Sequence, residues 1–408
     1  MRFDIVIPAY NEEQSIESIV RRCLAARATI IERTPVTEVT VTVVSDGSSD
    51  RTAELARAFE PDIGVVAYEK NRGYGAAIKT GFAEGDGELV GFLDADGTCD
   101  PECFAPMVAA LLERDASVAL GSRMGPDSKM PPIRRVGNAL WRTIINWLAQ
   151  TRITDAASGM RVMRRDALGA LEPLPDGLHY TPTMSCRAAL DARLSMVEIP
   201  MSYEEREGRS KLSVVRDGLR FLRTIIDVGL TYQPFRIISA PGFVLLLLAF
   251  ILGLPVLVEY LQIRQIAEDD IYRLLTVIVL STAGIQMFLT GLAGEHAVAI
   301  VHRKKWDGGP ALRLAKGVFT EPVLIGLGIA SIVCAIALNA GGLWTWVTRG
   351  YVSQHWSRTA TGAMLTLFGF QCLAAAVLYR MLRLLAHIPA VRRSREAAGR
   401  DTGDRAAV

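Results

Sequence analysis

The chain has 408 residues and a formal net charge of +2, from 45 Lys and Arg against 43 Asp and Glu. So small a basic excess argues against a protein that binds nucleic acid through bulk charge, because such proteins neutralise many phosphates. Half of the residues are hydrophobic and 22% are charged, which excludes a disordered chain. The length suggests two or three domains. Most charged residues precede residue 235, and most of the long apolar runs follow it.

The first part of the chain alternates strand and helix patterns. The expected strands are 3–8, 39–45, 64–68, 89–93 and 117–122, and the expected helices are 13–33, 50–59, 74–84 and 102–114. The strands are apolar or β-branched runs, and the helices repeat apolar residues at helical spacing. This order predicts an α/β domain over 1–209, with a mostly parallel, Rossmann-like sheet and helices on both faces. Ligands of such sheets bind beyond the carboxyl ends of the strands.

Residues 210–235 join the two parts of the chain. Leu212, Leu219 and Ile226 recur at helical spacing, with basic residues between them. A basic amphipathic helix next to a membrane span is typical of a helix that lies at the membrane interface. A solvated linker helix is the alternative interpretation.

Four uncharged stretches, each at least 21 residues long, follow this segment: 237–258, 274–294, 322–348 and 359–379. A helix needs about 20 apolar residues to cross a bilayer. We therefore expect an all-α transmembrane domain of four helices over 236–388 and a basic, disordered tail over 389–408. Basic residues concentrate in the loop between the second and third spans and in the tail. That bias predicts an integral protein of the plasma (inner) membrane with its N-terminal domain and both termini in the cytoplasm.

Polar side chains follow the first, second and fourth expected strands. A planar base could rest near Tyr10, with Glu12 and Asp46 accepting hydrogen bonds from the base or from a ribose. Asp94 and Asp96 could hold a divalent cation, Mg²⁺ or Mn²⁺, which would neutralise a diphosphate. Each segment alone could also be a turn or a helix cap. Their common place at one edge of the sheet favours a binding site.

The turn at 70–73, with the sequence KNRG, precedes the third expected helix. One interpretation is that this turn caps the helix. The other is that its cations or backbone amides line a nucleotide cleft.

Four segments in this order, IPAYNEE, VVSDGSSDRT, EKNRGYGAAIKTGF and GFLDADG, resemble the family 2 glycosyltransferases of the GT-A fold. Later segments are similar to the polyprenyl-phosphate branch of that family, which includes dolichol-phosphate mannosyltransferases and their bacterial counterparts. These segments are GSR at 121–123, RRVGN at 134–138, TDAASGMRVMRR at 154–165 and EIPMSYEEREGRSKL at 198–212. The resemblance covers roughly residues 2–215, and the ordered set is far more specific than any single motif.

The resemblance implies a set of donor-binding residues. Those that would hold the nucleoside of a nucleotide-diphosphate sugar are Pro8, Tyr10, Glu12 and Asp46. Asp94, Ala95 and Asp96 match the Asp-x-Asp motif, with Asp96 preferred as the direct metal ligand. Thr98 stands where the mannosyl enzymes often have Gln, and it could offer a further oxygen to the metal. Ser45 replaces the first of two aspartates common after the second strand, which leaves the donor base open.

The resemblance also implies residues for the pyrophosphate and the acceptor. A loop expected to close over the donor pyrophosphate contributes Arg206, Ser210 and Lys211. The cations expected to grip the acceptor phosphate are Arg123 and Arg135, with Arg134 a near-equal choice. Asp155 is interpreted as a base, as a residue that orients an acceptor-binding arginine, or as a helix N-cap. The expected catalytic residues are therefore Asp94, Asp96, Asp155 and Arg206.

These assignments predict a metal-dependent, inverting glycosyltransferase in the membrane. A phosphate oxygen of undecaprenyl or dolichyl phosphate would attack the anomeric carbon and give a lipid-linked monosaccharide for cell-envelope or glycoconjugate assembly. An oligomer is compatible with the sequence. The alternatives are transfer to another lipid or glycan acceptor, and a non-catalytic membrane scaffold with a vestigial nucleotide-sugar domain. A processive glycan synthase is disfavoured because the chain lacks a Gln-x-x-Arg-Trp motif.

Overall fold

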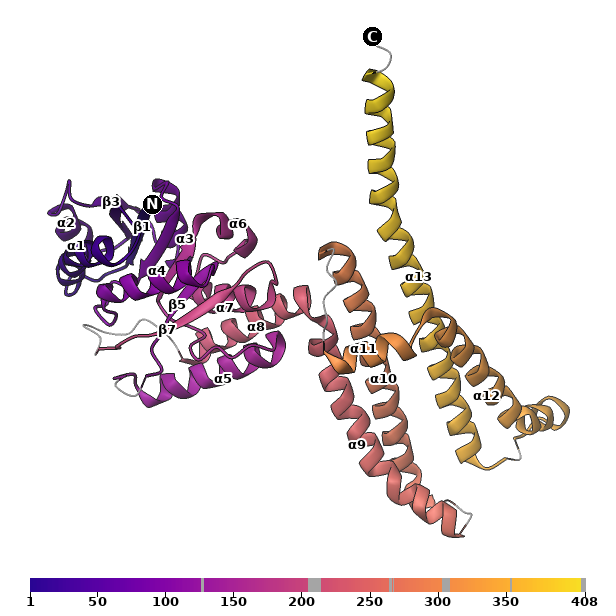
Figure 1. The fold of residues 1–408 in the computed structure, drawn as a ribbon. Coiled ribbons are helices and arrows are strands. Elements are labelled where there is room, and N and C mark those ends of the chain that lie inside the picture. Colours follow the sequence, from indigo (N-terminus) through magenta and orange to yellow (C-terminus); the bar gives the residue numbers. More distant parts are fainter. Residues whose placement is uncertain are drawn as a thin grey trace. The chain divides into compact units, whose positions relative to one another are not determined.

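The structure is a computed structural model that describes residues 1–125, 128–204, 214–263, 266, 268–302, 309–352 and 354–404. The chain divides into two compact units, Met1–Gly229 and Leu230–Val408. Figure 1 traces both units and labels many of their elements. Of the expected catalytic residues, Asp94, Asp96 and Asp155 belong to the first unit, and the expected membrane spans belong to the second.

The first unit is built on a seven-stranded sheet with the order β3-β2-β1-β4-β6-β5-β7. Its strands are β1 (Arg2–Ala9), β2 (Glu38–Ser45), β3 (Gly64–Ala67), β4 (Leu89–Leu93), β5 (Val118–Ser122), β6 (Met160–Arg164) and β7 (Met196–Pro200). Only β6 pairs antiparallel with its neighbours, β4 and β5, and the other described pairs are parallel. The expected mostly parallel α/β sheet is confirmed.

Helices cover both faces of this sheet (Figure 1). The described helices in this part of the chain are α1 (Ile16–Arg33), α2 (Thr52–Arg57), α3 (Tyr74–Glu84), α4 (Phe104–Glu113), α5 (Pro132–Ala149), α6 (Leu168–Leu171), α7 (Tyr180–Leu190) and α8 (Val214–Tyr232). Short 3-10 helices precede α4 and α6, at Pro101–Cys103 and Arg165–Ala167. The helix α8 lies within the segment where the sequence predicts an amphipathic helix.

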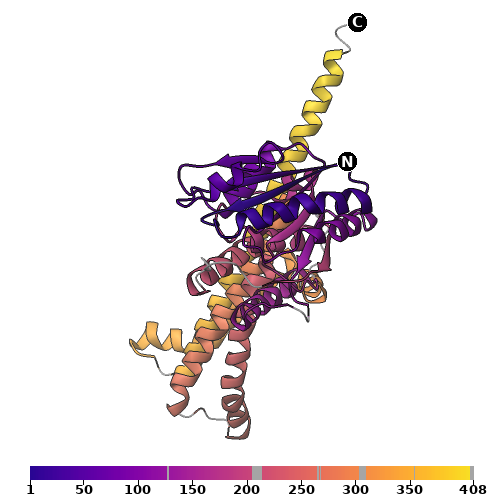
Figure 2. The same ribbon diagram turned by 90° about the vertical axis from the view of Figure 1, so that its left-hand side faces the viewer.

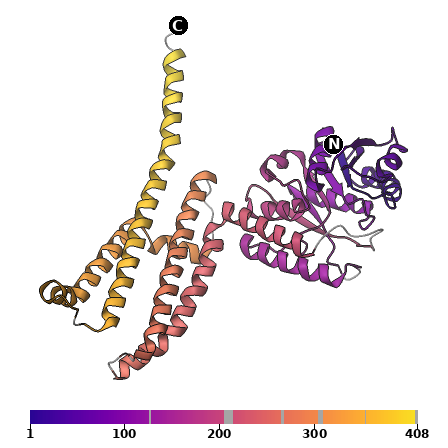
Figure 3. The ribbon, with the colours of Figure 1, turned by 180° about the vertical axis from the view of Figure 1, so that it is seen from behind.

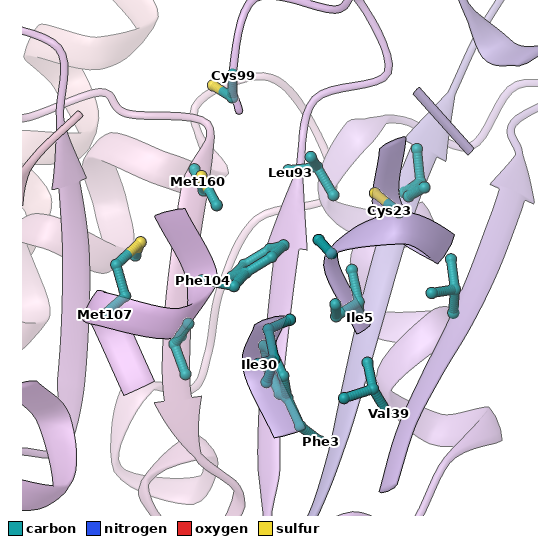
Figure 4. Packing of buried hydrophobic residues seen from close by; sticks show 14 of the residues in the cluster. Phe3, Ile5, Cys23, Ile30, Val39, Leu93, Cys99, Phe104, Met107 and Met160 are labelled. Carbon is teal, nitrogen blue, oxygen red and sulfur yellow. The ribbon is translucent and has the colours of Figure 1, made fainter. Parts of the chain in front are cut away.

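The core divides between the two faces of the sheet because successive side chains of a strand point to opposite sides. On β1, Phe3, Ile5 and Ile7 belong to the cluster that contains buried residues of α1 and α4, and Val6 belongs to the cluster with α3 and α7. Figure 4 shows the first cluster, in which Phe3 meets Phe104 with ring centroids 5.3 Å apart. Strands with apolar residues on both sides are expected where helices cover both faces.

The parallel register brings the functional segments to one edge of the sheet. Ala9 pairs with Ser45 at the carboxyl ends of β1 and β2, and Val6 pairs with Phe92 near the carboxyl end of β4. The residues that follow these strands therefore leave the sheet at the same edge. This is the edge where parallel α/β sheets bind ligands.

The second unit is helical. It contains α9 (Pro234–Ile263), α10 (Ile271–His302), α11 (Pro310–Val318), α12 (Glu321–Arg349) and α13 (Trp356–Asp404), with a short 3-10 helix at Glu268–Asp270. Four of the described helices are long and apolar enough to cross a membrane, at Pro234–Ile263, Glu268–Val301, Glu321–Arg349 and Trp356–Leu385. They coincide with the four spans expected from the sequence.

The long helices form two hairpins, α9 with α10 and α12 with α13 (Figures 2 and 3). Small residues allow the close approach in the first hairpin, because a Cβ on Gly242 would lie 2.9 Å from the carbonyl oxygen of Gly284. The backbone of α13 is helical as far as Asp404, within the segment where the sequence predicts a disordered tail. Alanine, arginine and glutamate in that segment favour a helix.

Candidate active site

The carboxylate of Asp46, at the end of β2, is 2% exposed and binds the segment that leads into α3. Its Oδ1 accepts the backbone N–H of Arg72 at 2.6 Å, and its Oδ2 accepts that of Gly73 at 2.8 Å. Gly47 makes this contact possible, because its φ is +69° and a Cβ there would lie 2.3 Å from the Asn71 nitrogen. Two backbone amides of the 70–73 turn therefore donate to Asp46. From the sequence alone, these amides were possible donors to a nucleotide.

The segment after β1 offers an aromatic ring at the same edge. Tyr10 is 39% exposed, whereas Pro8 is buried in the strand and pairs with Val44. The backbone N–H of Glu12 donates to Thr52 Oγ1 at 2.8 Å. This bond ties the two loops to one another, and the Tyr10 ring lies at the surface, where a planar base can stack on it.

The Asp-x-Asp segment, Asp94-Ala95-Asp96, follows β4. Asp94 is half-buried, and its Oδ1 accepts the hydroxyl of Tyr74 at 2.6 Å. Asp96 is 6% exposed, and its Oδ1 accepts both the backbone N–H of Thr98 at 3.2 Å and the Thr98 hydroxyl at 2.6 Å. Burial and the neighbouring Asp94 raise the pKa of the Tyr74 hydroxyl well above its usual value, so this group remains a donor at neutral pH.

An arginine of α1 holds the loop that follows the two aspartates. Arg22 Nη1 donates to the carbonyl oxygen of Gly97, and Nη2 donates to that of Cys99, both at 3.1 Å. These two hydrogen bonds fix the backbone of the residues that follow Asp96. The loop is therefore positioned by the fold before any ligand binds.

The carboxylates of Asp94 and Asp96 and the hydroxyl of Thr98 are hard oxygen donors. Such donors fit Mg²⁺ or Mn²⁺ rather than a softer metal. Within the described residues, no group of three or more His, Cys, Asp or Glu gathers into a metal cluster. A cation here would therefore draw its remaining ligands from a bound diphosphate and water, which is usual for Mg²⁺.

Asp155 and Arg123 form a buried ion pair on the other side of the Asp-x-Asp segment. Asp155 is 0% exposed and receives Arg123 Nε at 2.7 Å, Nη2 at 2.9 Å and the backbone N–H at 3.1 Å. Burial alone would raise the pKa of Asp155, but the charge and hydrogen bonds of Arg123 outweigh it and lower that pKa. Burial alone would lower the pKa of Arg123, but the charge of Asp155 and the hydrogen bonds to it outweigh burial and raise that pKa. Both groups are charged at neutral pH.

The loop that carries Asp155 is tied to two other elements. The side chain of Glu198, on β7, accepts the backbone N–H groups of Thr154 and Asp155 at 2.8–3.0 Å. The amide of Asn138, on α5, donates to the Thr154 carbonyl at 3.2 Å and accepts the Ala156 N–H at 3.0 Å. The position of Asp155 is therefore fixed independently of Arg123.

Two of the three arginines expected to bind the acceptor meet at Tyr203. The Arg123 guanidinium carbon lies 5.6 Å from the centre of the Tyr203 ring, and Arg134 Nη1 donates to the Tyr203 hydroxyl at 3.4 Å. Burial raises the pKa of the Tyr203 hydroxyl, while the charge of Arg123 opposes that shift. Arg135 instead donates to the carbonyl oxygen of Ser128 at 3.2 Å.

Arg206, Ser210 and Lys211 lie outside the residues that the structure describes. The chain that leads toward them starts at the site, because the backbone N–H of Glu204 donates to the Thr98 carbonyl at 2.9 Å. Their role at the pyrophosphate stays a prediction from the sequence.

An apolar stripe on α5 is exposed beside α8. It consists of Ile133 (62% exposed), Val136 (70%), Leu140 (53%) and Trp147 (49%). The two helices pack through Trp141 and Phe221, whose ring centroids are 6.4 Å apart. Leu219 on α8 is also 64% exposed, on the face that the sequence assigns to the membrane interface. Exposed apolar residues gathered on one helix are typical of an interaction site.

Residues 4–171 match the family described as "Glycosyl transferase family 2", and residues 234–392 match "Domain of unknown function (DUF8752)". The low-salt glycan biosynthesis hexosyltransferase Agl6 of Haloferax volcanii is 31% identical over 356 residues, which cover 85% of this chain and 80% of that protein. The chain belongs to glycosyl transferase family 2. An undecaprenyl-phosphate 4-deoxy-4-formamido-L-arabinose transferase of Klebsiella pneumoniae subsp. pneumoniae is 32% identical over 301 residues, covering 72% of this chain and 88% of that protein.

This family 2 glycosyltransferase is an enzyme and, with its four apolar helices, an integral membrane protein. Among solved structures, glucosyl-3-phosphoglycerate synthase of Mycobacterium tuberculosis, crystallised with Mn²⁺, UDP and phosphoglyceric acid, aligns with 56% of this chain and 78% of its own. Its identity is 19% and its TM-score is 0.44, so this likeness supports no inference about ligands here.

Several residues that shape the site of this glycosyltransferase were not identified from the sequence. They are Tyr74, Asn138, Glu198 and Tyr203, together with Arg22 on α1. Tyr74, Asn138, Glu198 and Tyr203 lie within the quoted family segments. Their spacing in the sequence does not reveal which residue each one contacts. Their roles follow from contacts between elements far apart in the chain.

Proposed function

We propose that the enzyme transfers a sugar from a nucleotide-diphosphate sugar to the phosphate of a polyprenyl phosphate at the membrane surface. The observation that carries this proposal is the buried Arg123–Asp155 pair beside Tyr203, next to the Asp-x-Asp segment. One edge of the sheet thus combines carboxylates suited to a metal-bound diphosphate with cations suited to a second phosphate. Relatives named for transfer to undecaprenyl phosphate support the choice of acceptor.

The donor would lie along the ends of β1, β2 and β4. The Tyr10 ring would stack on the base, and Glu12 and Asp46 would accept hydrogen bonds from the N–H groups of the base or from the ribose hydroxyls. Asp46 keeps lone pairs for this purpose, since a carboxylate accepts about four hydrogen bonds and the 72–73 amides take one on each oxygen. Asp94 and Asp96, with Thr98, would hold a Mg²⁺ or Mn²⁺ ion, which when bound offsets the charge of the departing diphosphate.

The acceptor would bind where Arg123 and Arg134 meet. Arg123 uses Nε and Nη2 for Asp155, and its Nη1 makes no hydrogen bond within the described residues, so this nitrogen can donate to a phosphate oxygen. The second pKa of a phosphate monoester is about 6, so the group is largely a dianion at neutral pH. It is therefore a nucleophile without help from a base, and the enzyme's task is to position it. Direct displacement inverts the anomeric centre.

Asp155 would orient Arg123 rather than accept a proton. Both of its oxygens bind the Arg123 guanidinium, and its pKa is lowered, which makes it a poor base. The helix-cap interpretation accounts for one bond alone, the Ala157 N–H that Asp155 Oδ1 accepts at 3.1 Å. The ion pair accounts for the burial of both charges.

The membrane orientation is part of the proposal. The basic loop between the second and third spans favours the cytoplasmic side for both termini and for the catalytic unit. A polyprenyl chain stays in the bilayer, so its phosphate is reached only at headgroup depth. The exposed apolar residues of α5 and α8 would rest on the bilayer there, because one residue separates α8 from the first apolar helix.

Replacing Val136 by glutamate tests that contact. We expect the KM for polyprenyl phosphate in vesicles to rise about 5- to 10-fold, since each buried CH₂ contributes about 0.8 kcal/mol, while the KM for the nucleotide sugar stays unchanged. Ile31→Glu is the matched control, because Ile31 is also exposed, at 43%, but lies on α1 and not on α5 or α8. An equal rise in both variants would contradict a membrane role for α5.

The proposed reaction is tested by a donor screen with the full-length chain in detergent. Radiolabelled GDP-mannose, UDP-glucose and UDP-N-acetylglucosamine are each incubated with undecaprenyl or dolichyl phosphate and with Mg²⁺ or Mn²⁺. We expect organic-soluble label that requires both the lipid phosphate and the metal. Nucleotide-sugar binding without lipid-linked product from any donor would redirect the assignment to another lipid or glycan acceptor. Loss of all binding would favour the scaffold interpretation.

A further inference from the structure

The hydroxyl of Tyr74 is placed to control the orientation of the first carboxylate in the Asp-x-Asp segment. It donates to Asp94 Oδ1 at 2.6 Å, the usual length of a hydroxyl bond to a charged acceptor. The Tyr74 ring is itself fixed between two aromatic rings, with centroids 6.4 Å from Phe92 and 6.5 Å from Tyr180, both edge to face. A rigid donor of this kind selects one rotation of the carboxylate.

The opposite side of the same carboxylate rests against Gly159, just before β6. A Cβ on Gly159 would lie 1.9 Å from Asp94 Oδ2 and 2.4 Å from Asp94 Cγ. Asp94 is therefore held between a hydroxyl on one oxygen and a glycine backbone on the other. The rotation of its carboxylate is therefore set by α3 and by the segment just before β6, and not by its own strand alone.

Tyr74 also connects the two carboxylate positions of the site. The residues directly before it, Arg72 and Gly73, donate their backbone N–H groups to Asp46. Asp46, the 72–73 backbone, Tyr74 and Asp94 thus form one continuous chain of contacts from the end of β2 to the end of β4. A shift of the 72–74 segment would move both carboxylates together.

We infer that Tyr74 is a positioning residue that sets the orientation of the Asp94 carboxylate for metal binding and couples it to the Asp46 end of the site. This inference rests on the proposed function only in taking Asp94 as a metal ligand. Tyr74 acts through Asp94, as outer-shell groups act on the ligands of other metal sites.

The test is Mn²⁺ binding by the full-length chain, measured as free Mn²⁺ by electron paramagnetic resonance with UDP or GDP present. In Tyr74→Phe the ring contacts remain and only the hydroxyl is lost. We expect the Mn²⁺ dissociation constant to rise roughly 10-fold, the usual scale for losing an outer-shell partner. Tyr68→Phe is the matched control, since its hydroxyl donates to Thr80 and not to a carboxylate. It is expected to keep the wild-type value.

The outcomes separate this inference from the reaction itself. Wild-type affinity in Tyr74→Phe would overturn it, as would an equal loss in Tyr68→Phe, because general loosening would then explain the change. If Tyr74→Phe does not fold, Tyr74→Trp keeps a ring and a donor at another position, and unchanged Mn²⁺ affinity there would also overturn it. If wild-type protein binds Mn²⁺ but transfers no sugar to polyprenyl phosphate, the role of Tyr74 stands and the proposed reaction fails.

Discussion

Replacing Asp155 by asparagine is expected to lower kcat/KM for polyprenyl phosphate by about 100-fold or more, mainly through the acceptor KM. Removing one partner of a buried, hydrogen-bonded charge pair costs about 2–5 kcal/mol, because the other charge is left unpaired. Here the unpaired charge is Arg123, whose side chain is only 13% exposed. Without Asp155 the guanidinium would turn toward water, away from the acceptor phosphate. The KM for the nucleotide sugar should change little.

The same variant is expected to lose stability at neutral pH. The folded-state pKa of Asp155 is lowered below its ordinary value of 3.8, so its contribution to stability is complete above pH 3.8 and is lost as the pH falls through the folded pKa. Thermal unfolding of wild type and Asp155→Asn should therefore differ by a constant amount between about pH 5 and 8. The two should converge only in acid.

Asp191→Asn provides a matched control for this prediction. Asp191 is 1% exposed and also makes a two-oxygen contact with an arginine, but its partner Arg193 is 64% exposed and lies outside the site. We expect wild-type KM values in this variant, since an exposed cation can regain water. If Asp155→Asn instead kept the acceptor KM and lost kcat with an altered pH profile, Asp155 would be a base and the orienting role would be wrong.

The architecture could be predicted because its signals are local. The buried strands are apolar runs, and the four membrane helices are uncharged stretches, so each can be recognised within its own segment. The antiparallel strand β6 was not predicted, although its residues were quoted as a motif. It contains Arg161, which is 0% exposed, and arginine is rarely buried. Its Nη2 donates to the Thr181 carbonyl and the Ser185 hydroxyl, both at 2.8 Å, contacts that the sequence does not reveal.

The candidate site was predictable in its members but not in its connections. Asp46, Asp94 and Asp96 were found because parallel strands end at one edge of the sheet. The partners of these residues lie at distances in the chain that no periodicity encodes, such as the 20 residues between Tyr74 and Asp94. Likewise, the apolar stripe on α5 is visible in the sequence, but an amphipathic helix usually buries such a stripe. Its exposure appears only once the neighbours of α5 are known.

Gly159→Ala is expected to lower sugar transfer by about 100-fold, the scale of loss when a catalytic group is displaced by about 1 Å. The pairing of Leu93 with Met160 sets Asp94 beside Gly159, and an added Cβ would lie 1.9 Å from Asp94 Oδ2. Real Cβ atoms essentially never come within 3.0 Å of another atom, so the carboxylate or the β4–β6 pairing must move. The carboxylate moves more easily, because the sheet around it is buried on both faces.

The measurement compares transfer rate, Mn²⁺ affinity and thermal unfolding in the same preparations. Gly169→Ala, on α6, is the control, since a Cβ there meets nothing within 4 Å and alanine favours a helix. Asp96→Ala gives the floor of activity for a site without its second aspartate. A Gly159→Ala protein that unfolds like wild type but binds Mn²⁺ weakly would tie the lost activity to Asp94. Full activity with unchanged unfolding would mean that the position of Asp94 does not matter, and the metal role assigned to it would have to be withdrawn.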